Sequence, residues 1–234
     1  MSEPRGEAVI FGAGSGLGKA LADVYRERGH PVLALTRQDL DLRDAAAVGR
    51  WLEAARASGR RFSRCIVSAG ALQAGLLSDL PAEAFAESIR LHALSPIEIM
   101  LGLSRAGLCR RFVFILSGAG DFLMPGLSPY ALGKRALKDF LYMAEMERSL
   151  PGVEILRVSP GGVATPFNKK ARIYGGYRLP GAGRRGRDPM ELARRIYDAD
   201  LRGEKALVLS RLPGFLGKLQ SLFGGLAAFL LRPR

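Results

Sequence analysis

A tyrosine and a lysine stand four residues apart in a segment that begins with Ser128-Pro129. At this spacing Tyr130 and Lys134 would project from one face of a helix. A phenol with an ordinary pKa of ~10 is a poor acid–base catalyst at neutral pH. A neighbouring ammonium group favours the phenolate and lowers that pKa towards the working range. Because such pairs also occur by chance on helix surfaces, this one indicates acid–base chemistry only together with other features.

A cluster of glycines lies between the apolar run Ala8–Phe11 and the first helical pattern, which starts near Leu17. Free backbone N–H groups and the positive end of the dipole allow a helix N-terminus to bind a pyrophosphate. Side chains at Gly12 or Gly16 would hold the phosphates away, and Gly18 lets helix and strand approach closely. The expected nucleotide-binding residues of this loop are Gly12, Gly14, Ser15, Gly16, Leu17 and Gly18.

The second predicted strand ends at Thr36-Arg37, where the two nicotinamide cofactors can be distinguished. An acidic residue there would hydrogen-bond the ribose hydroxyls of NAD, whereas a cation can pair with the 2′-phosphate of NADP. Arg37, with no carboxylate expected to repel that phosphate, favours NADP(H) over NAD(H). The alternative is that Arg37 is an ordinary solvated charge.

Short apolar runs alternate with helical patterns, and these elements must position the residues above. The predicted strands are Ala8–Phe11, Pro31–Leu35, Phe62–Val67, Phe112–Leu116, Val153–Val158 and Ala206–Leu209. Helices are expected at about 17–28, 44–57, 81–104, 128–149 and 188–201, with Asp44 and Ser128-Pro129 as helix starts. Strands that alternate with helices predict an α/β fold, a single doubly wound Rossmann domain over residues 1–210. Its parallel sheet should have about seven strands, with helices on both faces.

The composition is that of a packed globular protein, with 48% hydrophobic and 24% charged residues. The formal net charge of +13 favours anionic partners such as a phosphorylated cofactor or an acidic lipid surface. Cys65 and Cys109 lack metal-ligand spacing, so we expect neither a metal site nor a disulfide framework. No apolar segment precedes the first strand, which favours a cytoplasmic protein with reduced thiols.

The chain resembles the short-chain dehydrogenase/reductase family over roughly residues 7–210, through five motifs in order and at matching spacing. The family motif Thr-Gly-x-x-x-Gly-x-Gly matches at Gly12, Gly16 and Gly18, although Phe11 replaces the threonine. The motif Asn-Asn-Ala-Gly stands as Val67-Ser68-Ala69-Gly70, without either asparagine. Five motifs in order are much more specific than any one of them.

The other three motifs include the catalytic residues of the family. Its serine falls on Ser117, its Tyr-x-x-x-Lys on Tyr130 and Lys134, and its Pro-Gly motif on Pro160-Gly161, followed by Thr165-Pro166. The resemblance implies that Tyr130 exchanges a proton with the carbonyl or alcohol oxygen of the substrate. It implies that Lys134 holds the nicotinamide ribose and lowers the pKa of Tyr130. Ser117 would hydrogen-bond the oxygen on which negative charge develops.

The resemblance also implies further cofactor contacts. Asp41 and Leu42 stand where the family contacts adenine, and the short connection from Arg37 to Asp41 indicates that a helix usual there is missing. Thr165 and the backbone of Val163 would bind the nicotinamide carboxamide. The other positions carried over as cofactor-binding are Ala69, Gly70, Tyr130, Lys134, Pro160 and Gly161.

The sequence departs from the family at His92, which stands where an active-site asparagine is expected. In the family that residue supports a water between the lysine and solvent. His92 could do the same through a ring nitrogen or its backbone carbonyl, or it could be a packing residue. Because Ser117, Tyr130 and Lys134 are all present, only the proton relay depends on the answer.

Two further segments have unusual compositions. Residues 166–187 contain Lys and Arg but no acid, and they are expected to form a basic, mobile lid over the substrate. The lid is either a solvated loop or a site for an acidic substrate or lipid headgroup. Residues 211–234 form a tail whose apolar residues follow one helical stripe interrupted by glycines. This tail favours an interfacial helix on an anionic membrane over a transmembrane span, with packing onto the core or a sister subunit as the alternative.

Together these features favour an NADPH-dependent oxidoreductase with Tyr130 as acid/base. It would transfer a hydride between nicotinamide and a small carbonyl or alcohol substrate, hydrophobic or lipid-like. The alternative is a non-catalytic NADP(H)-binding sensor or scaffold on the same fold. No nucleic-acid-binding signature accompanies the positive charge. The resemblance further implies a homodimer or homotetramer, and the tail adds membrane association on the cytoplasmic face.

Overall fold

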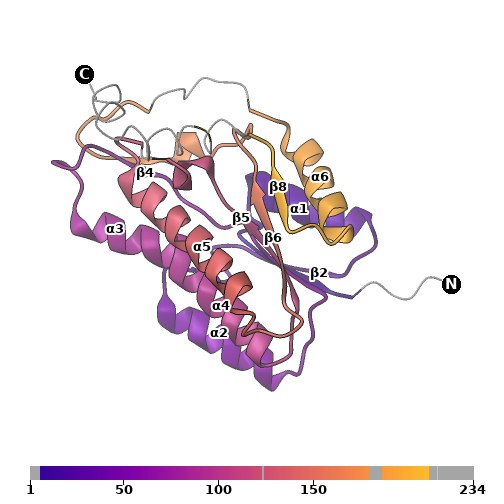
Figure 1. Cartoon of the computed structure of the whole chain (residues 1–234). Coiled ribbons are helices and arrows are strands. Elements are labelled where there is room, and N and C mark those ends of the chain that lie inside the picture. Colours follow the sequence, from indigo (N-terminus) through magenta and orange to yellow (C-terminus); the bar gives the residue numbers. More distant parts are fainter. Residues whose placement is uncertain (1–5, 123, 180–185, 211–214, 216–234) are drawn as a thin grey trace.

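A parallel β-sheet forms the centre of the computed structural model, which describes residues 6–122, 124–179, 186–210 and 215 (Figure 1). Neighbouring strands pair in parallel in the order β2-β1-β3-β5-β6-β8. They are β1 (Ala8–Phe11), β2 (Val32–Leu35), β3 (Arg64–Val67), β5 (Arg111–Ile115), β6 (Glu154–Ser159) and β8 (Ala206–Val208). The predicted doubly wound fold is confirmed, with six strands in the described sheet where about seven were expected.

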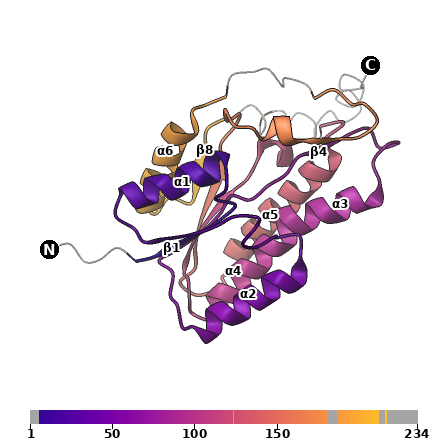
Figure 2. The same cartoon turned by 180° about the vertical axis from the view of Figure 1, so that it is seen from behind.

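Helices cover both faces of this sheet (Figures 1 and 2). One face carries α1 (Gly16–Glu27) and α6 (Pro189–Leu201). The other face carries α2 (Ala45–Ala57), α3 (Ala82–Ile89), α4 (Ser95–Arg105) and α5 (Ser128–Glu147). Because side chains alternate across a strand, β1 contributes to two cores. Val9 and Phe11 belong to the core on the α5 side, and Ala8 and Ile10 to the core on the α1 side.

A glycine ends α1, and the helix start predicted at Asp44 is confirmed. Gly29, at a φ of 80°, follows α1, and Asp44 accepts a hydrogen bond from the Ala47 N–H at 3.0 Å. Helix α5 starts at Ser128 as predicted, but Ser128 is its first helical residue and makes no cap. The N-cap residue is Leu127, without a side-chain hydrogen bond. Pro129 already fixes the backbone and removes one N–H in the first turn, so this helix starts without a polar cap.

The predicted segment 81–104 contains two helices with a π-helical turn, η1 (Arg90–Leu94), between them. The Ser95 N–H bonds the Arg90 carbonyl five residues earlier, which is the wider π pattern. Pro96 follows within the first turn of α4, where a proline is tolerated. Single π turns are rare in helices and occur often at functional sites. This one contains His92.

Residues 166–179 are folded, in contrast to the mobile loop expected from their composition. They contain η3 (Asn168–Lys170) and β7 (Arg172–Ile173), and β7 pairs in parallel with β4 (Gln73–Ala74). Beyond the gap in the description, Arg187 pairs with Val163. The segment is therefore attached to the body of the domain at both of its described ends.

The predicted tail lies outside the described residues except for Phe215, whose side chain is exposed. Its preference for a membrane, the core or a sister subunit therefore stays a prediction. Within the part of the chain that the structure describes, no helix combines the length and apolar character needed to span a bilayer.

Candidate active site

The carboxyl ends of the central strands meet at one edge of the sheet. Phe11 at the end of β1 pairs with Leu35 of β2 and with Val67 of β3. The glycine loop, Thr36 and Ser68 follow directly, so they come together although they are distant in sequence. Ile115 of β5 pairs with Val158 of β6, which brings Ser117 to the same edge. In open α/β sheets ligands bind at this edge.

Ser117, Tyr130 and Lys134 converge there. The Ser117 side chain hydrogen-bonds that of Tyr130, and its oxygen also accepts the Ala119 N–H at 3.2 Å. One turn further along α5, Lys134 donates from Nζ to the Ile115 carbonyl at 2.8 Å. The predicted spacing of Tyr130 and Lys134 thus places both beside the residues that follow β5.

Burial governs the protonation of the two groups on α5. It raises the pKa of Tyr130, and the hydrogen bond with Ser117 opposes this rise. It lowers the pKa of Lys134 to about 8, because this residue is only 5% exposed and burial disfavours the charged ammonium. The expectation of a lowered Tyr130 pKa is wrong for this structure, since the loss of solvent around the phenolate outweighs the favourable contact.

His92 lies beside this group and is 1% exposed. Its ring meets the Tyr130 ring edge-on, with centroids 5.1 Å apart and planes at 90°. Nε2 lies 3.2 Å from the Ala71 nitrogen, and Nδ1 lies 3.0 Å from the Ser88 carbonyl oxygen. His92 therefore lies next to Tyr130, as expected from its place at the family's active-site asparagine. Backbone groups of Ala71 and Ser88 contact its two ring nitrogens.

An apolar cluster surrounds the Tyr130 ring. Its buried members are Leu72, Ala74, Ala119, Leu127 and Tyr130, packed against Met124, Ala131, Phe167, Ala171, Tyr177 and Leu179. The Phe167 ring lies 5.7 Å from that of Tyr130. Sequence reasoning missed Phe167, whose only signal is its place directly after Thr165-Pro166. The cluster shows that hydrophobic side chains shield the phenol from water.

The glycine loop (residues 12–18, hereafter the cradle) packs so closely against neighbouring backbone that two of its positions cannot carry a side chain. A Cβ on Gly12, whose φ is 83°, would lie 2.5 Å from the Ala69 backbone, and one on Gly18 would lie 2.1 Å from the Gly12 carbonyl oxygen. Ser15 is the N-cap of α1 but makes no side-chain cap hydrogen bond, and the first turn has no acidic residue. The helix N-terminus therefore presents its N–H groups without a side-chain cap or a nearby carboxylate of its first turn, which suits a pyrophosphate.

The remaining predicted cofactor positions follow the carboxyl ends of β3 and β6. A Cβ on Gly16 would lie 3.1 Å from the Thr165 side chain, so Thr165 adjoins the loop. Gly70 lies next to His92 and Phe167. Pro160 and Gly161 follow the end of β6, and Gly161 has a φ of 73°.

Arg37 stands next to the glycine loop, since Gly14 faces Thr36. Its side chain is 75% exposed, and its Nε lies 3.3 Å from the Asp41 carboxylate. Asp39 accepts hydrogen bonds from the Thr36 N–H at 2.8 Å and from the Thr36 hydroxyl at 2.7 Å. The expectation that no carboxylate lies nearby is therefore wrong. Asp39 is nevertheless engaged by Thr36, and these bonds lower its pKa.

Asp41 belongs to a charged network that the sequence did not reveal. Arg43 donates to both Asp41 oxygens, which lowers the pKa of Asp41 to about 2. The same guanidinium donates to Glu87 of α3 at 2.6 Å. Leu42 is 3% exposed in the core, so its side chain is not free for adenine and only its main chain remains.

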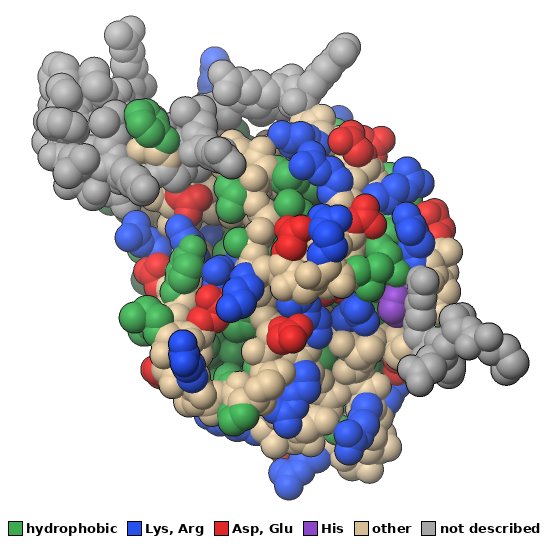
Figure 3. All heavy atoms as spheres, turned by 45° about the vertical axis from the view of Figure 1, so that its right-hand side comes forward, with side chains coloured by type: hydrophobic (Ala, Val, Ile, Leu, Met, Phe, Trp, Pro, Cys, Tyr) green, Lys and Arg blue, Asp and Glu red, His purple; other side chains and the backbone are tan. Residues whose placement is uncertain are grey.

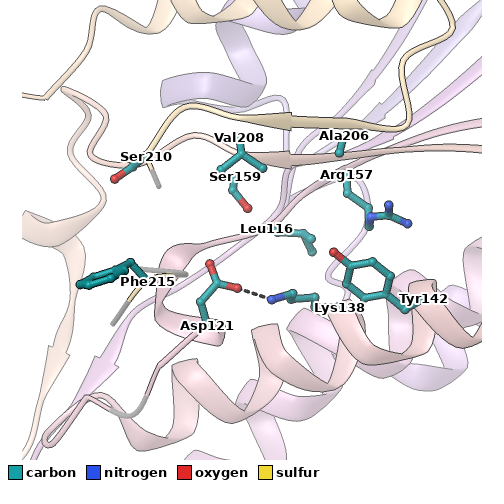
Figure 4. A pocket seen from close by; sticks show the side chains of 10 residues that line it. All are labelled: Leu116, Asp121, Lys138, Tyr142, Arg157, Ser159, Ala206, Val208, Ser210 and Phe215. Atoms are coloured by element: carbon teal, nitrogen blue, oxygen red, sulfur yellow. Dashed lines mark hydrogen bonds and ion pairs between the residues drawn. The ribbon is translucent and has the colours of Figure 1, made fainter. Parts of the chain in front are cut away.

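A cavity of about 400 Å³ lies between α5 and strands β6 and β8 (Figure 4). Lys138 and Asp121 form an ion pair across its floor. Its lining residues are Leu116, Asp121, Lys138, Tyr142, Arg157, Ser159, Ala206, Val208, Ser210 and Phe215. Ser117, Tyr130 and Lys134 are not among them, so we assign this cavity no part in the chemistry of the site.

Charged side chains are mixed over the surface. Figure 3 shows Lys and Arg interspersed with Asp and Glu on the face drawn, with apolar side chains between them. Some charged side chains of the described residues are paired along a helix, as in Lys19 and Asp23 at 2.6 Å. Exposed pairs of this kind contribute little to stability. On the face drawn, the positive charges therefore do not form a single patch (Figure 3).

Comparison with known proteins identifies the class of this site. Residues 38–173, more than half of the chain, match the family model described as short chain dehydrogenase. The chain therefore belongs to the short-chain dehydrogenase family and is an NAD(P)-dependent oxidoreductase of that class. The family inferred from five motifs is confirmed.

Individual relatives are distant. The chain is 24% identical over 195 residues to an NADPH-dependent 3-dehydrocapnine reductase of Ornithobacterium rhinotracheale, covering 72% of this chain and 69% of that one. It is 26% identical over 194 residues to a 3-ketodihydrosphingosine reductase of Eremothecium gossypii, covering 70% and 62%. A short-chain dehydrogenase of Burkholderia cenocepacia, solved in complex with NADP, shares the fold at a TM-score of 0.76 and 16% identity over the full length of both chains.

Proposed function

We propose that the protein is an NADPH-dependent carbonyl reductase in which Tyr130 supplies the proton. The observation that carries this proposal is the convergence of Ser117, Tyr130 and Lys134 at the sheet edge that also holds the glycine cradle. The raised pKa of Tyr130 keeps the phenol protonated at neutral pH. A protonated phenol is the form that reduction of a carbonyl requires, and its raised pKa makes it a weaker acid than a free tyrosine.

The residues of this chain would divide the chemistry as follows. Bound NADPH would supply the hydride. Ser117, oriented by the Ala119 N–H, would donate a hydrogen bond to the substrate oxygen as negative charge develops there. Tyr130 would transfer its phenolic proton to the same oxygen, and the nearby Lys134 ammonium would stabilise the phenolate that remains. The apolar cluster around Tyr130 would exclude water and strengthen these interactions.

The cofactor preference rests on Arg37. Its exposed guanidinium adjoins the glycine loop, where a 2′-phosphate could pair with it. One relative is described as NADPH-dependent and one solved neighbour contains NADP, which agrees with this preference. We expect Arg37→Glu to weaken NADPH binding about tenfold or more, with NADH binding changed much less. Fluorescence titration of both cofactors would measure this, with exposed Arg61→Glu as the control. Equal losses for both cofactors would contradict the preference.

The substrate is proposed to be a hydrophobic 3-oxo compound. Phe167 and the apolar cluster surround Tyr130, and the names of both cited relatives specify reductases of 3-keto or 3-dehydro compounds. The test is NADPH oxidation with ethyl 3-oxobutanoate and ethyl 3-oxododecanoate. We expect a higher kcat/KM for the longer ester, because the added methylenes bury apolar area. Absence of NADPH oxidation with both esters, or a preference for the short one, would count against this substrate class.

Two expectations from the sequence remain predictions of this proposal. The C-terminal tail would bind anionic phospholipid vesicles, and the protein would form a homodimer or homotetramer. Vesicle flotation with the full chain, with and without anionic lipid, tests the first. Light scattering of the full chain tests the second.

A further inference from the structure

The contacts of His92 define which of its ring nitrogens carries a proton. The Ala71 N–H can only donate, so Nε2, 3.2 Å away, must be its acceptor. The Ser88 carbonyl can only accept, so Nδ1, 3.0 Å away, must carry the hydrogen. The Ser88 hydroxyl lies at the same distance from Nδ1 and can rotate to suit this arrangement. The geometry therefore corresponds to one neutral tautomer.

The surroundings of the ring oppose a second proton. His92 is 1% exposed, and the titratable side chains that face it are Tyr130 and Lys134 of α5. Burial, and secondly the positive charge of Lys134, hold the pKa of His92 well below its ordinary range. Protonation would also turn Nε2 into a donor that opposes the Ala71 N–H. A proton shuttle through this imidazole is therefore disfavoured at neutral pH.

The ring also stands where three elements meet. Ala71 belongs to the turn after β3, whose Ala69 packs against Gly12 of the cradle. Ser88 belongs to α3. On the side of α5, a Cβ on Gly133 would lie 2.9 Å from the Ser88 carbonyl oxygen and 3.0 Å from the His92 Cβ. The absence of a side chain at this glycine lets α5 approach closely, and Tyr130 and Lys134 lie on the same stretch of helix.

We propose that His92 is a positioning residue for the reaction. Its neutral imidazole bridges Ala71 and Ser88, and its ring edge holds the Tyr130 ring beside Ser117 and Lys134. It acts through Tyr130 and carries no proton of the reaction. The catalytic consequence rests on the proposed function, whereas the bridge itself does not.

The bridge is tested by ¹⁵N NMR of the imidazoles in the full-length protein. The chain has two histidines, so His30→Gln leaves His92 as the one remaining signal. We expect shifts of a neutral ring protonated at Nδ1 that stay constant from pH 5 to pH 8. A ring that titrates in this range, or one protonated at Nε2, would overturn the proposal. This experiment needs no substrate, so its outcome is independent of the proposed function.

The positioning role is tested with three variants. His92→Gln keeps an amide near the Nε2 position, His92→Asn keeps one near Nδ1, and His92→Leu removes both. We expect His92→Leu to lower kcat on ethyl 3-oxododecanoate by about tenfold or more, since small misplacements of reacting groups are costly. Its NADPH affinity should change less, the limbs of the pH–rate profile should stay in place, and His92→Gln should recover part of the rate.

Other results would separate the alternatives. A kcat of His92→Leu equal to that of the wild type, measured well below its Tm, would show that His92 only packs. The loss or shift of one limb of the pH profile would show a titrating relay instead. If the wild type itself fails to reduce the ester, the proposed function fails, and the NMR result still decides whether the bridge exists.

Discussion

Two buried polar clusters lie at opposite ends of the strands of the sheet. Each contains a tyrosine close to a charged side chain. At the edge where β3 and β5 begin, Asp200 accepts hydrogen bonds from Tyr25 at 2.7 Å, Arg64 at 2.5 Å and Arg111 at 2.7 Å. At the edge where β5 ends, Tyr130 bonds Ser117, and Lys134 bonds a neutral carbonyl. The first cluster pairs opposite charges, whereas the second leaves a buried cation with a carbonyl as its hydrogen-bond partner.

This difference separates stability from chemistry. Tyr25 and Tyr130 both have raised pKa values, and burial is the main cause in each. Asp200 adds to the rise for Tyr25, whereas Ser117 opposes it for Tyr130. The pKa of Lys134, about 8, lies near the working range. A buried charge without a counter-charge is costly to the fold but responsive to a ligand, which is typical of functional sites.

The largest expected effect distinguishes the two tyrosines. Tyr130→Phe should lower kcat with the 3-oxo ester by more than about a hundredfold, because a general acid contributes this much or more. Tyr25→Phe should leave kcat unchanged and lower the free energy of unfolding by about 1.5–3 kcal/mol, the range for a hydrogen bond to a charged group. Steady-state rates and urea unfolding of both variants measure this. Similar losses of activity in both would break the comparison.

Removal of the central carboxylate should cause the largest loss of stability. Asp200→Ala removes the carboxylate shared by Tyr25, the partly buried Arg64 and the buried Arg111, which should cost about 3 kcal/mol or more. Asp139→Ala, which removes a carboxylate from an exposed pair on α5, is the control and should cost at most about 1 kcal/mol. Chemical denaturation measures both values. Equal costs would show that the Asp200 cluster does not hold α6 to the sheet.

A smaller, pH-dependent effect should come from Lys134. Its pKa in the folded chain is about 8, below the ordinary 10.5, so the unfolded chain binds more protons between these values. The contribution of this group to stability is therefore unfavourable below pH 8 and improves as the pH rises towards 10.

In the unliganded protein, Lys134→Met should remove this dependence. The difference in unfolding free energy between variant and wild type should shift in favour of the wild type by up to about 1.4 kcal/mol per pH unit across this window. Denaturant titrations at pH 7, 8 and 9.5 test it. A difference that stays constant with pH would mean that Lys134 keeps an ordinary pKa.

The sequence predicted the features that arise from local patterns. The glycine loop could be predicted because positive φ and close backbone approach require glycine at Gly12. The Tyr130 and Lys134 pair could be predicted because a helix fixes their spacing. The proximity of Asp39 to Thr36 was missed, although it is local, because the side-chain direction in a turn has no periodic signal.

The features that the sequence did not predict depend on contacts between distant segments. Glu87 meets Arg43 from α3, and Phe167 meets Tyr130 from the segment after β6. Burial likewise reversed the expected direction of the Tyr130 pKa, because exclusion of solvent depends on every element packed around the phenol. The tautomer of His92 needed the positions of the Ala71 N–H and the Ser88 carbonyl, which motif spacing does not contain.

The most direct test follows one hydrogen atom. NADPH carrying deuterium at the transferable C4 position of nicotinamide is incubated with ethyl 3-oxododecanoate and the full-length protein. Mass spectrometry should then find deuterium on the new carbinol carbon with the wild type, and more than about a hundredfold more slowly with Tyr130→Phe at equal NADPH occupancy. Undiminished transfer by Tyr130→Phe, or bound NADPH without any transfer by the wild type, would contradict the assignment of this site.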